Sequence, residues 1–219
     1  MELYLIRHAQ SFNNAVPDEQ RVEDPPLTEM GHQQARLAAD WIVAAGLTRL
    51  ITSPFRRALQ TTEYIKSTTG LTPEVWIDLH EQGGCVSGHE AITYTGRPGL
   101  SAGEIKREYP DYTLPPDIDG DGWWKSKPYE TVHRAEIRAE RLVECVHQTF
   151  GGTQERVAFV MHGTFKRILV GKVFGRSVLQ EDWLCDVYNT AISKVIVPAG
   201  KPRLVFYNAI GHLPLDAVT

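Results

Sequence analysis

The chain has 219 residues and a formal net charge of −4, and 42% of its residues are hydrophobic while 23% are charged. This ordinary globular composition excludes a disordered or fibrous chain, and the length suits one large domain with a substantial core. The negative charge argues against a nucleic-acid-binding protein, because no basic excess is present to displace counterions from phosphates.

The first ten residues hold only a four-residue apolar run, which is too short for a secretory signal or a membrane span. Three cysteines without a CxxC pair suit a reducing compartment. We therefore expect a cytoplasmic protein with no membrane partner and no nucleic-acid partner. The oligomeric state stays open, a homodimer included.

Strand-like and helix-like patterns alternate along the chain. Short apolar runs predict strands at residues 2–6, 47–52, 75–79, 157–161, 191–197 and 204–207. Helical periodicity and capping residues predict helices at about 28–46, 53–69, 132–151 and 163–174. This alternation is typical of an α/β domain with a mostly parallel sheet covered by helices on both faces, an α/β/α sandwich.

Residues 81–130 interrupt this pattern. They are rich in Gly and Pro and carry a single helical signal at 102–108. Connections of this length are usually functional or disordered. We expect one domain over residues 1–219, with this excursion covering a site.

Polar residues follow three of the predicted strands: Arg7-His8, the segment from Ser53 to Arg57, and His162. Ligands of open α/β sheets bind at the carboxyl ends of the strands, so these residues are expected to meet in one crevice. Helix N-termini there favour an anion. Imidazole and guanidinium groups around an anion suggest phosphoryl transfer, with a carboxylic acid to protonate the leaving group. The residues alone do not select that acid among 27 carboxylates.

Five ordered segments resemble motifs of the histidine phosphatase superfamily, branch 1, the phosphoglycerate mutase-like family. Arg7 to Ser11 resembles RHGxS, with Ala9 in place of Gly, and Asn14 stands where the family has a phosphate-binding asparagine. Residues 24–35 are similar to D-x-P-L-T-x-x-G-x-x-Q-A, residues 53–61 to S-x-x-x-R-A-x-Q-T, and residues 160–163 to V-x-H-G. We expect the small Ala9 to be tolerated, whereas Thr164, which replaces a second Gly after the last motif, departs from the family at a point that affects the geometry of that loop.

The resemblance implies a phosphoglycerate mutase-like fold over nearly the whole chain and a metal-independent reaction without a cofactor. It makes His8 the residue that is phosphorylated, with His162 stabilising the transferring group. Arg7, Asn14 and Arg57 would line the phosphate pocket. Arg57, unlike Arg56, precedes the family's Ala-x-Gln-Thr, so we expect Arg56 on the solvated surface.

The proton donor of the family lies in an L-x-E stretch, which Leu79-His80-Glu81 matches. Glu81 is therefore the candidate acid, the alternative being a solvated loop carboxylate. His80 and His89 flank this acid and are candidates for a role in the substrate loop. Glu130 and Arg138 are expected to serve structure or the surroundings of the site.

Residues 99–105 resemble the Gly-x-Ser/Thr-x-x-Glu-Ile of broad phosphatase members, which favours hydrolysis of small phosphomonoesters. Phosphoglycerate mutase-type transfer and a non-catalytic phospho-ligand-binding protein are the alternatives. Several residues of the excursion are candidates to touch the substrate beyond its phosphate, with ordinary loop packing as the alternative: Arg97, Trp123, Trp124, Lys125 and Lys127.

Two metal readings compete with this one. His8, His162 and Glu81 have the composition of a zinc-ligand set, but no HExxH pair puts two ligands on one helix face. Asp117, Asp119 and Asp121 match the opening of an EF-hand loop, yet Pro128 stands where the loop needs Glu. We therefore expect no metal site.

Overall fold

The computed structural model describes residues 1–88, 93–179, 184–198 and 201–219. A six-stranded sheet forms its centre, in the order β3-β2-β6-β1-β7-β8. Four strands are mutually parallel, and β7 runs antiparallel to both β1 and β8. The strands are β1 (Glu2–Arg7), β2 (Arg49–Thr52), β3 (Glu74–Val75), β6 (Arg156–Met161), β7 (Ile192–Ile196) and β8 (Arg203–Ala209). The predicted mostly parallel sheet is confirmed.

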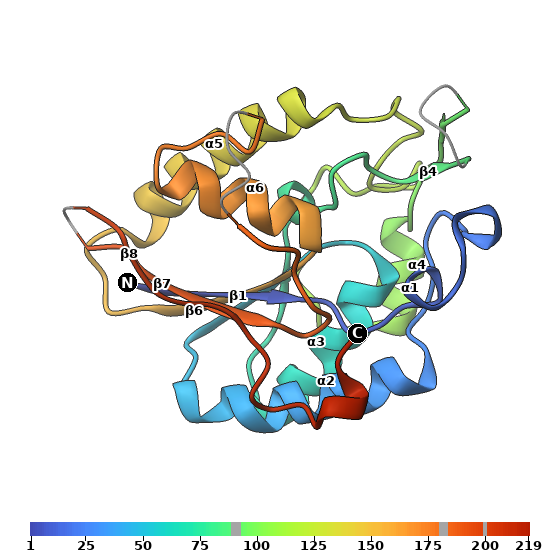
Figure 1. The fold of residues 1–219 in the computed structure, drawn as a ribbon. Coiled ribbons are helices and arrows are strands. Elements are labelled where there is room, and N and C mark those ends of the chain that lie inside the picture. Colours follow the sequence, from blue (N-terminus) through green and yellow to red (C-terminus); the bar gives the residue numbers. More distant parts are fainter. Residues whose placement is uncertain (89–92, 180–183, 199–200) are drawn as a thin grey trace.

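Helices cover both faces of this sheet (Figure 1). On one side lie α5 (Val132–Phe150) and α6 (Gly163–Val173), and on the other α2 (Glu29–Ile42) and α3 (Arg56–Thr69). Alternate residues of β1 divide between the two cores: Leu3 and Leu5 pack with α5 and α6, whereas Tyr4 and Ile6 pack with α2 and α3. A strand buried on both faces needs a continuous apolar run, which is why the segment reads that way. The three-layer α/β/α arrangement is confirmed.

Two predicted boundaries were wrong. The helix predicted from Ser53 begins at Arg56, with Phe55 as its N-cap, and the Ser53 hydroxyl bonds His162 and the N–H of Phe55. The strand predicted at 75–79 is confined to β3. The chain then turns into a 3₁₀ helix (Ile77–Leu79), closed by a hydrogen bond from the N–H of Leu79 to the carbonyl of Trp76.

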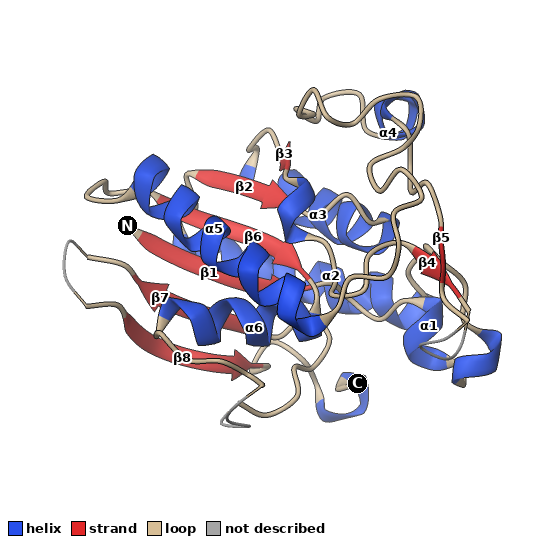
Figure 2. Ribbon diagram, turned by 90° about the horizontal axis from the view of Figure 1, so that it is seen from above, coloured by secondary structure: helices blue, strands red, loops and turns tan. Residues whose placement is uncertain are grey.

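The excursion at 81–130 lies beyond the carboxyl ends of the parallel strands, close to α1 (Phe12–Ala15) (Figure 2). It contains a short antiparallel pair, β4 (Val86–Ser87) and β5 (Thr95–Gly96), and the predicted helix α4 (Ala102–Glu108). An aromatic cluster, which includes Tyr112, Trp123 and Trp124, packs it against Phe55 and Leu59 of the α3 region. In the described residues, no helix combines the length and apolarity that crossing a membrane requires.

Candidate active site

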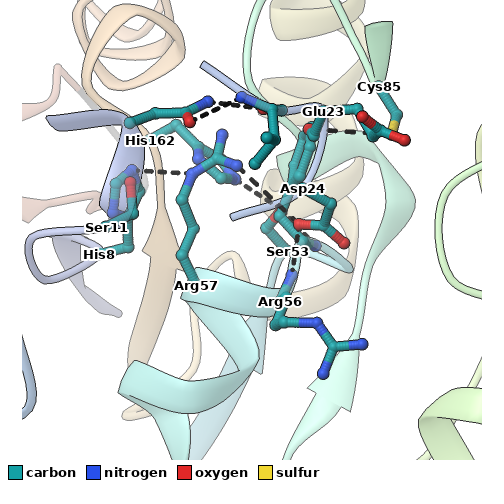
Figure 3. A network of polar contacts seen from close by, with 12 residues as sticks. His8, Ser11, Glu23, Asp24, Ser53, Arg56, Arg57, Cys85 and His162 are labelled. Atoms are coloured by element: carbon teal, nitrogen blue, oxygen red, sulfur yellow. Dashed lines mark hydrogen bonds and ion pairs between the residues drawn. The ribbon is translucent and has the colours of Figure 1, made fainter. Parts of the chain in front are cut away.

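Three adjacent parallel strands deliver the centre of the site. The last residues of β1 and β6 are paired, Arg7 with Met161, and β2 pairs with the other side of β6. The next residue on each chain segment is therefore His8, His162 or Ser53. The imidazole centroids of His8 and His162 are 5.0 Å apart. The side chains expected to meet at the strand ends thus come together around two histidines (Figure 3).

The hydrogen bonds of His8 identify its reactive nitrogen. Its Nδ1 lies 2.7 Å from the carbonyl oxygen of Ala9, which can only accept, so Nδ1 carries the proton. Arg57 Nε donates to Nε2 of His8 at 3.1 Å, so Nε2 presents its lone pair. Burial, together with the charges of Arg57 and Arg7, holds the pKa of His8 well below its usual value. His8 is therefore a neutral imidazole at neutral pH.

Hydrogen bonds to α2 and α3, the two helices on one face of the sheet, hold the loop that follows His8. The N–H of Ala9 donates to Thr61 of α3, and that of Gln10 donates to Gln34 of α2. Close approach of α2 depends on Gly31, because a Cβ there would lie 2.0 Å from the carbonyl oxygen of Gln10. Ala9 is fully buried and has no positive φ, so its methyl group fits where the resemblance led us to expect Gly.

Ser53 fixes the second histidine, a role that sequence reasoning missed. The Oγ of Ser53 lies 2.7 Å from Nε2 of His162 and accepts the N–H of Phe55 at 3.4 Å. The Ser53 hydroxyl can donate to Nε2, and in that tautomer the imidazole proton is on Nδ1. This buried Nδ1 has no partner among the described residues. Burial and the nearby positive charges hold the pKa of His162 well below its usual value, so the ring is neutral.

Two arginines adjoin the histidines. The Arg57 side chain is 11% exposed and stacks its guanidinium over Phe55, 4.1 Å from the ring centroid. Arg7 donates through Nη1 to the carbonyl of Val187, and its buried Nε has no partner within the described ranges. A Cβ on Gly163 would lie 3.3 Å from that Nε, so the glycine leaves room for the guanidinium. Desolvation lowers the pKa of both arginines.

Arg56 leaves the pocket, as expected. Its Nη1 pairs with Glu108 of α4 at 2.6 Å. Only the second arginine of the α3 N-terminus reaches the histidines.

Glu81 sits at the N-terminus of α6. Its Oε1 accepts the N–H groups of Phe165 and Gln82 at 2.9 and 2.8 Å, and its Oε2 accepts that of Thr164 at 3.3 Å. The charge of this carboxylate opposes the desolvation that lowers the pKa of Arg7 and Arg57. The acid expected from the resemblance is therefore beside the arginines rather than free in a solvated loop.

A buried ion pair anchors the main chain before Glu81. Arg138 makes two hydrogen bonds to Glu130, at 2.9 and 2.6 Å, with side chains that are 3% and 9% exposed. Its Nη1 donates to the carbonyls of Asp78 and His80, at 2.5 and 3.1 Å. The guanidinium also covers the Phe165 ring at 3.6 Å. Both residues thus act on the surroundings of the acid. His80 is buried beside it, and His89 lies outside the described residues.

Asn14 lies near His8 through Asn189, a second residue that sequence reasoning missed. The Nδ2 of Asn189 donates to the carbonyl of His8 at 3.0 Å and to Oδ1 of Asn14 at 3.4 Å. The same Oδ1 accepts from the N–H and hydroxyl of Ser11. The hydrogen bonds of the Asn14 side chain are thus made through its oxygen. No motif in the sequence pointed to Asn189.

A cavity of about 270 Å³ opens beside Arg57 and Glu81. Segments from the α1 region and the excursion form its walls, with these residues among the lining: Asn13, Arg21, Glu23, Gln82, Ser87, Tyr94 and Tyr129.

The other excursion candidates do not line this cavity. Trp123 is buried, 4.7 Å from Phe55, which in turn contacts His162. Trp124 packs on His80, and Lys127 covers the Trp124 ring. Lys125 pairs with Asp119, and Arg97 donates to Ser87. In the described residues, no group of three metal-ligating side chains comes together.

Comparison with known proteins gives the family. The model of the histidine phosphatase superfamily, branch 1, matches residues 3–210. The chain belongs to this superfamily. Probable phosphoglycerate mutase GpmB of Yersinia pestis is 39% identical over 72 residues, which span 33% of this chain and 34% of that protein. The chain therefore matches only about a third of the length of such curated relatives.

Solved structures share the fold over the full length. Mycobacterial glucosyl-3-phosphoglycerate phosphatase has a TM-score of 0.67 at 20% identity, covering 95% of this chain and 99% of its own. A phosphoserine phosphatase mutant of Entamoeba histolytica has a TM-score of 0.65 at 20% identity, covering 97% and 99%. YhfR of Bacillus stearothermophilus has a TM-score of 0.69 at 23% identity, covering 96% and 98%. At these identities the likeness establishes the fold.

Proposed function

We propose that this histidine phosphatase superfamily member hydrolyses small phosphomonoesters through a phosphohistidine on His8, without a metal ion. The observation that carries the proposal is the buried, neutral His8, whose Nε2 lone pair faces Arg57 while Nδ1 is fixed by Ala9. Around it, Arg7 Nε and His162 Nδ1 are buried nitrogens without partners in the described chain, and Nδ1 is a donor when Ser53 donates to Nε2 of His162. A phosphoryl group would give those donors the oxygens that they need.

In the first step, His8 Nε2 attacks the phosphorus atom and the bond to the ester oxygen breaks. Arg7, Arg57, Asn14 and His162 bind the phosphoryl oxygens, and Glu81 gives its proton to the departing alkoxide. In the second step, Glu81 takes a proton from water as the water oxygen attacks phosphorus. The N–P bond then breaks, which releases phosphate and restores neutral His8.

The decisive assay measures release of inorganic phosphate from a generic aryl phosphate in excess EDTA. We expect turnover that the chelator does not reduce. Phosphoglycerate mutase-type transfer is the second candidate, because the matched segment is shared with probable mutases. Transfer of phosphate between phosphoglycerate positions without net release, or complete absence of turnover, would contradict the proposal.

Glu81→Gln tests the proton donor. The amide keeps the size of the side chain but supplies no acidic proton, so the loss of kcat should grow with the basicity of the leaving group. We expect a loss of about 10²–10⁴-fold on an alkyl phosphate and a much smaller one on p-nitrophenyl phosphate. Equal losses on both substrates would remove Glu81 from this role. Glu104→Gln serves as the control. Glu104 exchanges hydrogen bonds with Ser101 at the N-terminus of α4, and the same chemical change there should leave kcat unaltered.

We further propose a cytoplasmic location. The three cysteines are all free, which suits a reducing compartment. The proposed partner is a small phosphorylated metabolite, with phosphate ion as product.

A further inference from the structure

Asp24 is a buried carboxyl group next to the phosphate site to which the reaction above gives no part. Its Oδ1 accepts the backbone N–H of Arg56 at 2.9 Å and lies 4.0 Å from Nη1 of Arg57. Its Oδ2 is buried without a partner in the described part of the chain. Figure 3 shows Arg57 between this carboxyl group and His8. One of the two carboxyl oxygens of Asp24 therefore accepts no hydrogen bond, and leaving a buried polar atom unpaired costs free energy of folding.

We propose that Asp24 is a positioning residue for the phosphate site: it holds Arg57 beside Nε2 of His8, and it takes up a proton when a tetrahedral dianion binds there. The guanidinium has two neighbours on opposite sides, the carboxyl group and the imidazole. A bound dianion would become its main counter-ion. The charge of the carboxylate would then repel the ligand, and protonation would remove that repulsion.

The surroundings of Asp24 bring the pKa of its carboxyl group close to neutral pH. Burial raises its pKa to about 6, while the charges of Arg57 and Arg56 oppose that rise. Cys85 faces it as a neutral thiol, because burial raises the thiol pKa to about 12. The remaining titratable neighbours are Glu23 on its own segment and Glu108 and Tyr109 at the end of α4. Asp24 is thus ionised in the free protein at neutral pH, ready to accept a proton.

Proton uptake by Asp24 makes the affinity for the dianion depend on pH. Binding that takes up a proton weakens as pH rises, from the pKa of the free carboxyl group to that of the bound one. Sulfate is the probe, since it stays a dianion from about pH 5 to about pH 8 and needs no turnover. Histidines that gain protons on binding would do so in wild type and variant alike, so the difference between the two isolates Asp24.

Asp24→Asn keeps an oxygen for the Arg56 N–H but stays neutral at every pH. We expect it to bind sulfate about tenfold more tightly than wild type near pH 7.5, with the two affinities converging near pH 5. Asp40→Asn, the same chemical change on the exposed face of α2, should follow wild type at each pH. Parallel pH profiles for Asp24→Asn and wild type would overturn the inference.

Two further measurements keep the test decisive. If Asp24→Asn does not fold, Asp24→Ser takes its place. Calorimetry of wild type in two buffers of different ionisation enthalpy measures proton uptake directly, and absence of uptake near pH 6.5 would overturn the inference. The inference rests on the proposed phosphate site but not on hydrolysis. Failure of sulfate to bind would contradict both, whereas sulfate binding that ignores Asp24 contradicts this inference alone.

Discussion

His8→Ala should lower kcat for hydrolysis of an aryl phosphate by at least about 10⁴-fold, since removal of a nucleophile leaves only binding and electrostatic contributions. The alanine cannot form the N–P bond, because the substitution removes the nitrogen whose lone pair lies beside Arg57. The measurement is phosphate release in excess EDTA, with folding checked by circular dichroism.

His133→Ala is the matched control, because His133 is exposed in the first turn of α5 and does not line the cavity beside Arg57 and Glu81. It should keep wild-type activity. In wild type, rapid quenching during turnover should trap an acid-labile phosphoryl group on His8. Substantial hydrolysis by His8→Ala would refute the covalent mechanism.

Arg138→Ala should lower the free energy of unfolding by about 3–5 kcal/mol, the usual cost of removing one partner of a buried ion pair. The loss leaves the Glu130 carboxylate uncompensated and frees the carbonyls of Asp78 and His80, which precede Glu81. Activity on alkyl phosphates should fall with it, because the main chain that carries the acid loses its anchor. Urea denaturation gives the stability.

Arg141→Ala is the control on the same helix, an exposed residue one turn further along α5. It should change the free energy of unfolding by less than about 0.5 kcal/mol. The double variant Glu130→Leu/Arg138→Met should be more stable than Arg138→Ala, since no charge is left buried alone. A loss below about 1 kcal/mol in Arg138→Ala would show that the pair is dispensable.

The sequence predicted the layers well and the local chemistry only in part. The β1 run is apolar on both faces and Thr28 has the expected capping bond to Gly31, so periodicity and caps located these elements. Ser53 misled the prediction, because a serine before a proline suits a helix cap equally well. Its bond to His162 depends on strand order, which one sequence does not contain.

Contacts between distant parts of the chain also explain why the roles of Asn189 and Asp24 were not predicted. Asn189 reaches His8 from 181 residues away, and Asp24 lies 32 residues from Arg56. Pairings over such separations have no local signature. The two tryptophans show the converse, since Trp123 and Trp124 suggested a substrate cover but fill the core that joins the excursion to Phe55. Aromatic residues in a long loop can therefore indicate how the loop packs on the protein rather than which ligand it binds.

The excursion at 81–130 has its own apolar cluster and supplies much of the cavity wall, whereas the groups around Nε2 of His8 come from the strand ends and α3. On the proposed function, recognition of the leaving group would therefore fall largely to the excursion, which also supplies Glu81, and binding of the phosphoryl group to the strand ends and α3. Substitutions at the cavity-lining residues between Gln82 and Tyr129 would then change which ester is accepted, whereas substitutions of Trp123 would also disturb Phe55 and, through it, His162. The cavity-lining residues of the excursion are therefore the positions to exchange when specificity is to be redesigned.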